Sequence, residues 1–452
     1  MITLFFSLAL LASPLVAHSA PRSWQKHLPT MDERAQQASP WLRTLIHMHS
    51  IHSHDACDKK PQKNGNPNER CLEDFRRGLC REHVDLVFIT EHRKSLAEIS
   101  FQDMIPIRDN DRLLLEGGKV IGTEHTCPDG HKVTMYQGSE NSMMALGLTR
   151  HPEPVPGSTL EQTYNALTPE AAASFRQAGG IVGMSHAEEK EKDIGLLRQI
   201  RPEVIEAYNL HANLLQTVKP KVRVGRTLET LVEVLSFISN PLVEPDLIFH
   251  AFFSENQPSL RKWSQLAMDG EVTGIAGTDA HQNAFPIKMW DVERVDSYRR
   301  SIRWFSNWIK APKQPTRLQA LDALKAGRSL VVFETLGDPL GFDFWATSAQ
   351  GTHLMGDKIS WNSVGGAGLT LNVRIPPQAQ SQVKVQILKA TDEGWVPVAQ
   401  SNHQDLSYQP TEPGAYRAEL RMIPRHLRRH LRTKGYLIRE MPWVYSNAIY
   451  VR

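Results

Sequence analysis

The sequence predicts an α/β domain of the barrel type followed by a small antiparallel β-sandwich. Between residues 41 and 310, short apolar stretches alternate with amphipathic ones in a β-α-β rhythm. After about residue 340, apolar residues alternate with small or polar ones, and Pro-Gly and Asp-Glu-Gly turns lie between the runs. A chain of 452 residues is also longer than one ordinary domain. We therefore expect domains at 21–310 and 341–452, joined by a linker and helix at 311–340.

The first residues resemble an export signal. Residues 2–17 form an apolar run followed by small residues, which predicts a signal peptide at 1–20 with cleavage between Ala17 and Ala20. The alternative is an uncleaved anchor, but the run is short and interrupted by Ser and Pro. We expect a periplasmic or secreted protein with no stable membrane span after cleavage.

The first domain begins with a polar lead-in, at 21–40, and continues as strands and helices. A helix should start at Thr168, the N-cap, with Pro169 at its first position, and end at Gly179 and Gly180. The other predicted helices are 69–82 and 101–116. The predicted strands are 41–46, 84–90, 119–121, 181–184, 204–208, 247–253 and 272–276.

The second part starts with a linker at 311–316 and a short helix at 318–326 that ends at Gly327. Period-two patterns then predict strands, because alternate side chains of a strand share one face. These strands are 369–375, 383–387, 416–422 and, at the end of the chain, 442–452.

Nine residues have the order and spacing of a site for several metal ions. They are His47, His49, Asp55, His92, Glu124, His131, His186, Asp279 and His281. The first two and the last two are spaced so that both side chains of a pair point the same way from a strand. Most follow a predicted strand, which is where α/β barrels hold their chemistry.

The stretches that carry these residues resemble motifs of the polymerase and histidinol phosphatase (PHP) family. They are 47–55, 87–92, 122–124, 181–186 and 277–281, and the similarity covers 41–310. The resemblance implies a distorted (β/α)7 barrel with two or three metal ions at the carboxyl ends of its strands. It also implies a hydrolase, usually of phosphoesters.

The resemblance assigns roles motif by motif. It places Glu124 between two ions, and it makes His131 a further ligand after Glu124. In the first motif His54 or Asp55 fills the ligand position, and we choose Asp55. Glu91 stands where the family commonly has aspartate, which leaves its role open. The seven positions that match the family best are His47, His49, His92, Glu124, His186, Asp279 and His281.

Six histidines and three carboxylates favour Zn²⁺, Mn²⁺ or Fe²⁺ over Ca²⁺ or Mg²⁺. We expect two to three such ions, which would activate water for attack. Three divalent ions would outweigh three carboxylates, so a small anionic substrate is expected. His186 or His281 would pass a proton to the leaving group. Arg93 would contact the substrate phosphate, unless it is a solvated loop charge.

The leading hypothesis is an exported phosphoesterase for a small phosphate mono- or diester. A carboxylester or carbamate hydrolase is the alternative, because the tail after 323–328 is similar to that of carbaryl-hydrolase-like members of the family. A third reading, from another class, is a periplasmic binding module with structural metals. A net charge of +3 with 22% charged residues gives no reason to expect nucleic-acid binding. The oligomeric state stays open.

Export would make the four cysteines eligible for disulfides. A bridge between Cys57 and Cys71 would close a polar loop that contains Pro and Gly. A bridge between Cys57 and Cys127 is the rival pairing. Two further possibilities stay open, namely a thiolate ligand at Cys127 and four reduced, buried thiols.

Overall fold

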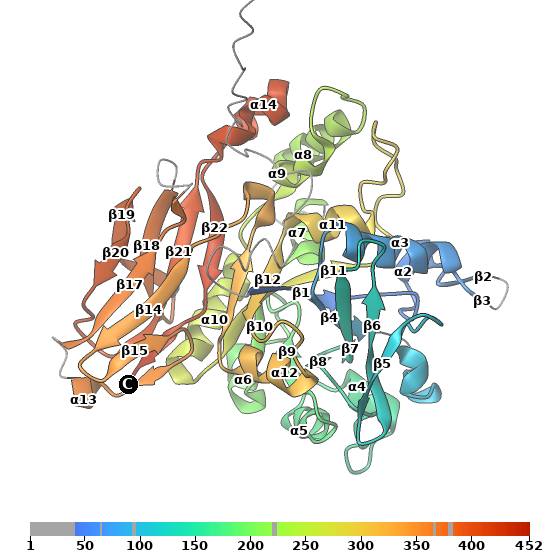
Figure 1. Cartoon of the computed structure of the whole chain (residues 1–452), viewed down its shortest axis with the longest axis horizontal. Helices are drawn as coiled ribbons and strands as arrows, with labels where there is room; N and C mark the ends of the chain where they lie inside the picture. The colour runs from blue at the N-terminus through green and yellow to red at the C-terminus, as the bar shows by residue number, and fades with distance from the viewer. Residues whose placement is uncertain (1–40, 64–65, 93–95, 219–223, 365–367, 378–382) are drawn as a thin grey trace, which may run out of the picture.

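The computed structural model describes residues 41–63, 66–92, 96–218, 224–364, 368–377 and 383–452. Within them, a closed barrel of seven strands is joined to a β-rich tail (Figure 1). The expected signal peptide at 1–20 and the lead-in at 21–40 lie outside the described residues. Within the described part of the chain, no helix is both long and apolar enough to cross a membrane.

The barrel closes because each of its strands pairs with two neighbours in the ring. In ring order the strands are β1 (Trp41–Met48), β4 (Leu86–Glu91), β7 (Lys132–Glu140), β8 (Met144–Leu146), β9 (Ile181–Met184), β10 (Val204–Asn209) and β11 (Thr273–Ala280). Five pairings around the ring are parallel. The two pairings of β8 are antiparallel. The barrel is therefore mixed, and the predicted distorted (β/α)7 barrel is not confirmed.

A hairpin replaces the helix that was predicted at 101–116. The segment holds the single turn η2 (Gln102–Met104) and then β5 (Arg112–Glu116), which pairs with β6 (Lys119–Thr126). Gly117 and Gly118 both have positive φ, which a two-residue hairpin turn of this kind requires. Backbone pairing with β6 thus prevails over the helix-like spacing of the leucines, and Leu113 and Leu115 stay exposed.

The strand predicted at 247–253 is also wrong. This run forms η3 (Pro245–Ile248) and α9 (Phe249–Phe252). Its residues are buried, and the ring of Phe249 packs on Tyr208 and Trp304. An apolar run that is buried on every side has no periodicity that separates strand from helix.

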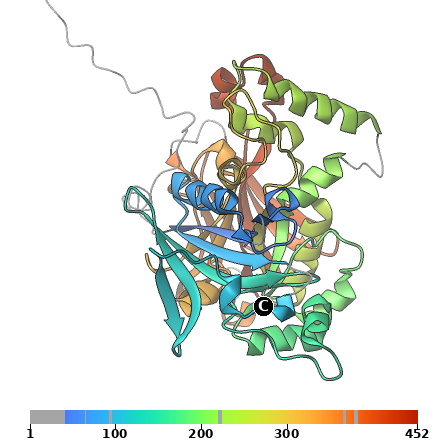
Figure 2. The same ribbon diagram turned by 90° about the vertical axis from the view of Figure 1, so that its right-hand side faces the viewer.

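The other helices lie around the barrel, apart from α13 and α14 in the tail, and they follow the predicted pattern at 69–82, 168–180 and 318–326 (Figures 1 and 2). The Thr168 hydroxyl accepts a hydrogen bond from the amide of Ala171, as expected of an N-cap. The helices are α2 (Ala56–Lys59), α3 (Glu69–Arg81), α4 (Leu160–Asn165), α5 (Pro169–Gln177), α6 (Ile194–Ile200), α7 (Leu210–Val218), α8 (Val224–Ile238), α10 (Gln257–Asp269), α11 (Tyr298–Trp304), α12 (Arg317–Lys325), α13 (Trp361–Val364) and α14 (Arg428–Leu431).

The tail contains two packed sheets, and one of them continues from the barrel. Strand β12 pairs with β1 and β13, and the sheet runs on through β22, β21, β18 and β19. The second sheet has the order β15-β14-β17-β20. The strands are β12 (Ser306–Lys310), β13 (Ser329–Val332), β14 (Asp343–Ser348), β15 (Gly351–Leu354), β16 (Lys358–Ile359), β17 (Thr370–Arg374), β18 (Val383–Thr391), β19 (Gly394–Asn402), β20 (Leu406–Tyr408), β21 (Gly414–Met422), β22 (Met441–Ser446) and β23 (Ile449–Val451).

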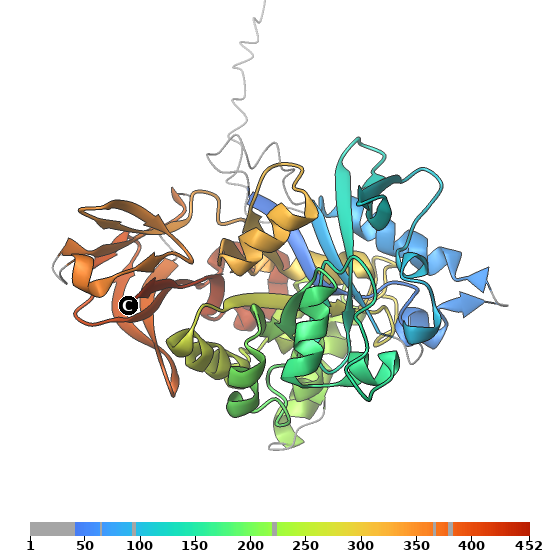
Figure 3. The ribbon, with the colours of Figure 1, turned by 90° about the horizontal axis from the view of Figure 1, so that it is seen from below.

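Figure 3 shows this tail at one side of the barrel. Contacts between them are specific as well as apolar. Arg417 lies over the rings of Trp263, Trp395 and Tyr445, which come from both parts of the chain. The Tyr450 hydroxyl bonds to the backbone of Val272. The tail and barrel therefore share both a sheet and a packed interface.

A buried ion pair ties the first strand to the segment before the tail. Arg43 on β1 and Glu334 are both fully buried, and the Arg43 Nη2 lies 2.5 Å from a Glu334 oxygen. The guanidinium also donates to the backbone oxygens of Glu82 and Ile302. Trp308 donates its indole N–H to Glu334 at 2.9 Å. Each of the two buried charges is therefore compensated by its partner.

Removing one partner should leave an uncompensated buried charge. We expect Glu334→Ala to lower the free energy of unfolding by about 3–5 kcal/mol, measured by urea denaturation. Glu412→Ala is the control, because Glu412 is mostly exposed and pairs with Lys389 at the surface. Its effect should stay below about 1 kcal/mol. Equal effects of the two variants would contradict the structural role of the buried pair.

Candidate metal centre

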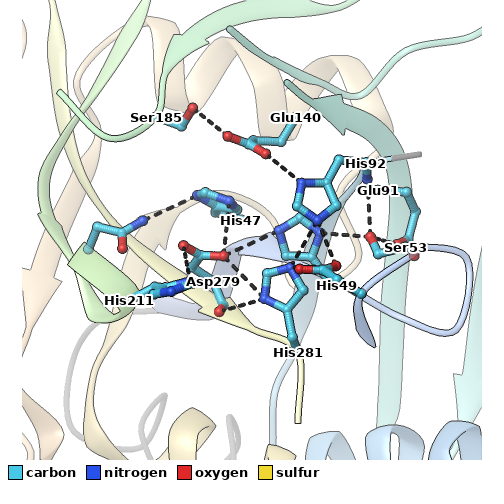
Figure 4. Close-up of polar contacts among 12 residues, drawn as sticks. His47, His49, Ser53, Glu91, His92, Glu140, Ser185, His211, Asp279 and His281 are labelled. Carbon is cyan, nitrogen blue, oxygen red and sulfur yellow. Dashed lines mark hydrogen bonds and ion pairs between the residues drawn. The ribbon is translucent and has the colours of Figure 1, made fainter. Parts of the chain in front are cut away.

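Histidines and carboxylates from five strands meet at the carboxyl end of the barrel (Figure 4). We call this set the cluster: His47, His49, Asp55, His92, Glu140, His186, Asp279 and His281. These residues lie in or directly after β1, β4, β7, β9 and β11, apart from Asp55, which lies in the loop before α2. Parallel strands end at the same edge of a barrel, so short sequence motifs far apart in the chain converge.

Within the cluster, three groups bring their nitrogen or oxygen atoms within 4.8 Å of one another. They are His49 with His92 and His281, His47 with Glu140 and His186, and His47 with His49 and Asp279. The groups share members, as expected for neighbouring ions held by common ligands. Residues of these types suit borderline transition metals.

Hydrogen bonds fix the orientation of the imidazole rings. The Nδ1 of His47 lies 2.6 Å from a carboxylate oxygen of Glu206, and the Nδ1 of His281 lies 3.0 Å from the backbone oxygen of Asp279. Both oxygens can only accept, so each Nδ1 carries the proton. The Nε2 atoms then present lone pairs to the cluster. An oxygen acceptor behind the ring is the usual support for a metal-binding histidine.

His49 follows the same logic through Ser53. The Ser53 hydroxyl donates to Glu91 at 2.5 Å, so it accepts from the Nδ1 of His49 at 2.8 Å. The Nε2 atoms of His47 and His49 and the Oδ2 of Asp279 are buried without a hydrogen-bond partner. Buried polar atoms without partners are rare and costly. The donor set therefore fits a group of metal ions.

The electrostatics of the cluster favour positive charge. Burial alone would lower the pKa of His92, but hydrogen bonds to Asp55 and Glu140 raise this pKa to about 10. Burial would also lower the pKa of His186, but the hydrogen bond to Glu188 and the charge of Asp279 raise it to about 10. The pKa of Asp55 falls to about 2 against the effect of burial, because His92 bonds to it. Carboxylates thus favour positive charge at His92 and His186, whereas burial and the neighbouring His281 hold the pKa of His49 well below its ordinary value.

Glu91 and Glu206 support the cluster from behind. Glu91 is buried, which raises its pKa to about 7, and it accepts bonds from the Ser50 amide and hydroxyl. It thereby holds the turn after β1 in place. Glu206 on β10 accepts from His47, from the backbone amide of His186 at 2.7 Å and from Asn209 at 3.0 Å. Both carboxylates position ligand-bearing segments.

The backbone at the cluster is itself unusual. His47, His186 and Asp279 all have positive φ, between 43° and 62°. Such conformations are unfavourable for residues with a side chain and gather at functional sites. Here they turn each side chain toward the shared space at a strand end.

The expectation for Glu124 needs correction. Glu124 on β6 faces Thr134 at the start of β7, and its carboxylate pairs with Arg112 at 2.7 Å and Lys132 at 3.1 Å. Thr134 and Glu140 stand at opposite ends of β7, about 20 Å apart at the rise of a strand. Because β6 runs antiparallel to β7, its end points away from the cluster. Glu140, which was not among the predicted ligands, occupies the place expected of Glu124.

Glu140 contacts both sides of the cluster. Its Oε2 lies 3.1 Å from the Nδ1 of His92, and its Oε1 lies 3.9 Å from the Nε2 of His186. The Ser185 hydroxyl donates to Oε1 at 2.9 Å. Burial alone would raise the pKa of Glu140, but His92 and the other histidines hold this pKa well below its ordinary value. The signal in the sequence is a glutamate at the end of the run 132–140, which forms one strand.

His131 is also outside the cluster. Its Nε2 donates to the backbone oxygen of Val84 at 2.7 Å, near the amino ends of β4 and β7. Arg93 lies outside the described residues. In the first motif, the carboxylate of Asp55 lies 2.7 Å from His92 and 3.4 Å from His281, whereas His54 is exposed. His54, Asp55 and His92 also bring their nitrogen and oxygen atoms within 4.8 Å of one another, so Asp55 and His54 both stay candidates for the first motif.

His211, at the start of α7, stands at the rim of the cluster. Its Nδ1 lies 3.6 Å from an Asp279 oxygen, and its side chain is 38% exposed. Its ring also lies near those of His186 and His281. His211 was not predicted to lie here, because it is not part of a motif.

Two disulfides connect the four cysteines. Cys57 bonds to Cys71, as predicted, and Cys80 bonds to Cys127. The rival Cys57–Cys127 bridge and the thiolate ligand at Cys127 are therefore wrong, as is the interpretation with four reduced thiols.

The first disulfide holds the segment that carries Asp55. Cys57, Asp58 and Lys59 have left-handed backbone conformations, with φ near 60°. The amide of Cys57 donates to the backbone oxygen of His281 at 2.9 Å, and Asp58 pairs with Arg294 at 2.6 Å. This left-handed turn is unfavourable by itself, so the anchors keep it beside the cluster.

Comparisons of this chain with family models, curated proteins and solved structures gave no match.

The corrected position of the bridging carboxylate gives a direct test. Glu140→Gln should lower the metal content of purified protein by at least one ion, because Glu140 contacts two histidine groups. Elemental analysis measures the content. Glu124→Gln is the matched control and should leave it unchanged. Loss of metal in the control variant alone would restore the original assignment.

The disulfides should differ in their effects. Cys57→Ser/Cys71→Ser should weaken metal retention during dialysis against chelator, because the Asp55 segment loses an anchor. Cys80→Ser/Cys127→Ser should lower stability and leave metal retention unchanged. Chain entropy predicts losses of about 3 and about 4 kcal/mol, respectively. Equal metal retention in both double variants would contradict the anchoring role.

Proposed function

We propose that this protein is an exported metal-dependent hydrolase of the PHP type that acts on small phosphate mono- or diesters. The convergence of imidazole Nε2 atoms supports this most directly, because those of His47 and His49 are buried without a hydrogen-bond partner. The Nδ1 atoms of His47, His49 and His281 face acceptors, and their Nε2 atoms face a common space. Such an arrangement has little purpose without cations to fill it.

The charge of the cluster supports an anionic substrate. Two to three Zn²⁺, Mn²⁺ or Fe²⁺ ions would be held by the cluster. Three divalent ions would bring six positive charges against the three carboxylates of Asp55, Glu140 and Asp279. The excess of three positive charges favours phosphate over a neutral ester.

Exposure of the cluster supports catalysis over a purely structural metal site. The side chains of Asp55, His92 and His186 are 22%, 22% and 21% exposed. Structural zinc sites are closed by protein ligands, whereas catalytic ones keep an open position. The binding module with structural metals is therefore the weaker alternative.

The residues divide the work as follows. The ions, when bound, would supply an activated water and offset the charge that develops on the ester. Glu140 and Asp279 hold the histidine groups at fixed separation. His186 and His281 are committed to the cluster, so His211 at the rim is better placed to give a proton to the leaving group from its imidazole nitrogen.

A carboxylester or carbamate hydrolase is the second candidate. The observation in its favour is a hollow beside His281 whose walls are mostly apolar. An uncharged ester would tolerate such walls as well as a phosphate ester would.

Assays of metal-loaded protein test the proposal. We expect turnover of p-nitrophenyl phosphate or bis-p-nitrophenyl phosphate well above that of p-nitrophenyl acetate, with loss of activity on chelation. Asp279→Asn should lower the rate of hydrolysis at least a hundredfold, because Asp279 links two histidine groups. Asp129→Asn, at an exposed turn, is the control and should retain activity.

Faster turnover of the acetate than of either phosphate would favour the carboxylester alternative. No hydrolysis of any of the three esters by protein that retains its metal would contradict the proposal.

A further inference from the structure

We infer that the hollow beside His281 and His211 binds a short apolar group of the substrate, next to the ester bond. The inference rests on the proposed hydrolase function. It says that the group esterified to the phosphate is a short apolar one. It concerns residues that do not belong to any motif of the cluster.

The hollow opens on the cluster itself. Asp279, His281 and His211 form one side of it, and Figure 4 shows these three side chains together. A phosphate held at the cluster would therefore leave its ester substituent facing this hollow.

The remaining walls are apolar and come from separate elements. The lining side chains are Leu210 and Leu214 of α7, Val234 of α8, Phe252 of α9, Trp304 of α11 and Phe285 in the loop after β11. Trp304 donates its indole N–H to the backbone oxygen of Asp246 at 2.8 Å, so only its apolar surface is left for a ligand. Several elements thus combine to build one apolar surface.

Most polar groups at the edge of the hollow already have partners, but the Oε1 of Gln282 has none. Asn283 donates to the backbone oxygen of Asp55 at 2.9 Å, and Gln282 donates to Asp74. Asp296 accepts from the amides of residues 284 and 285 and from Arg294. Besides the cluster itself, the Oε1 of Gln282 is the acceptor left without a partner among these side chains, and the apolar walls favour an alkyl group over a sugar or polyol.

The size of the hollow limits the group. The volume of the hollow is about 60 Å³. A cavity volume of about 10–15 Å³ is enough to hold one water molecule. The hollow therefore has room for about four non-hydrogen atoms. A butyl group fits, whereas a nucleoside does not.

Binding of phosphonates that cannot be hydrolysed tests this by calorimetry with zinc-loaded protein. Each buried methylene strengthens binding by about fourfold. We therefore expect butylphosphonate to bind at least tenfold more tightly than methylphosphonate. Leu214→Asn should reduce this preference at least threefold and leave methylphosphonate binding unchanged.

Leu231→Asn is the matched control, because Leu231 lies on neighbouring α8 but is exposed and does not line the hollow. It should keep the full preference for the butyl compound. If Leu214→Asn fails to fold by circular dichroism, Phe285→Asn replaces it, since Phe285 is only partly buried.

A second experiment compares the rates of hydrolysis of n-propyl phosphate and glycerol 1-phosphate, which have the same three-carbon skeleton. Preference for the propyl ester, lost in Leu214→Asn, supports the inference. Equal binding of both phosphonates with clear ester hydrolysis overturns the apolar subsite and leaves the proposed function intact. Failure of both phosphonates to bind, with no ester hydrolysed, overturns both.

Discussion

The burial of nitrogen and oxygen atoms without hydrogen-bond partners at the end of the barrel is the constraint on which the rest of the site depends. The Nε2 atoms of His47 and His49 and the Oδ2 of Asp279 have no hydrogen-bond partner. Each would cost roughly 1–3 kcal/mol if it stayed uncompensated. Such a cost is tolerated at functional sites, and cations would compensate all three atoms together. Because the atoms are held in place, any ion that enters meets ligands that need little rearrangement.

These atoms stay without hydrogen-bond partners only if the segments that carry them are held rigidly. Glu206 fixes two histidine segments, and Glu91 fixes the turn that carries Ser53 and, through it, His49. The Cys57–Cys71 bridge holds Asp55 from outside the barrel. In the described part of the chain, the second sheet of the tail does not contact the cluster. The first sheet extends from β1, so it supports the strand that carries His47 and precedes His49.

Much of this could be predicted from sequence, because strand ends with paired ligands leave a local signature. His47 with His49 and Asp279 with His281 were proposed from their spacing, their position after predicted strands and the resemblance to PHP motifs. The carboxylate expected to bridge two ions was assigned to Glu124 and not to Glu140 because both lie near strand ends, and only strand direction separates them. Direction depends on pairing with distant strands, which no local pattern records. Glu206 was missed for a similar reason, since its role comes from contacts with His47 and His186 across the barrel.

We propose that the histidine and carboxylate atoms of the cluster hold metal ions. Anomalous diffraction from crystals of zinc-loaded protein tests it most directly. The account predicts two or three peaks, with Nε2 atoms of His47, His49 and His281 at about 2.0–2.1 Å from zinc and a Glu140 oxygen between two of the peaks. Peaks beside Glu124 or His131, or no peak at the carboxyl end of the barrel, would contradict it.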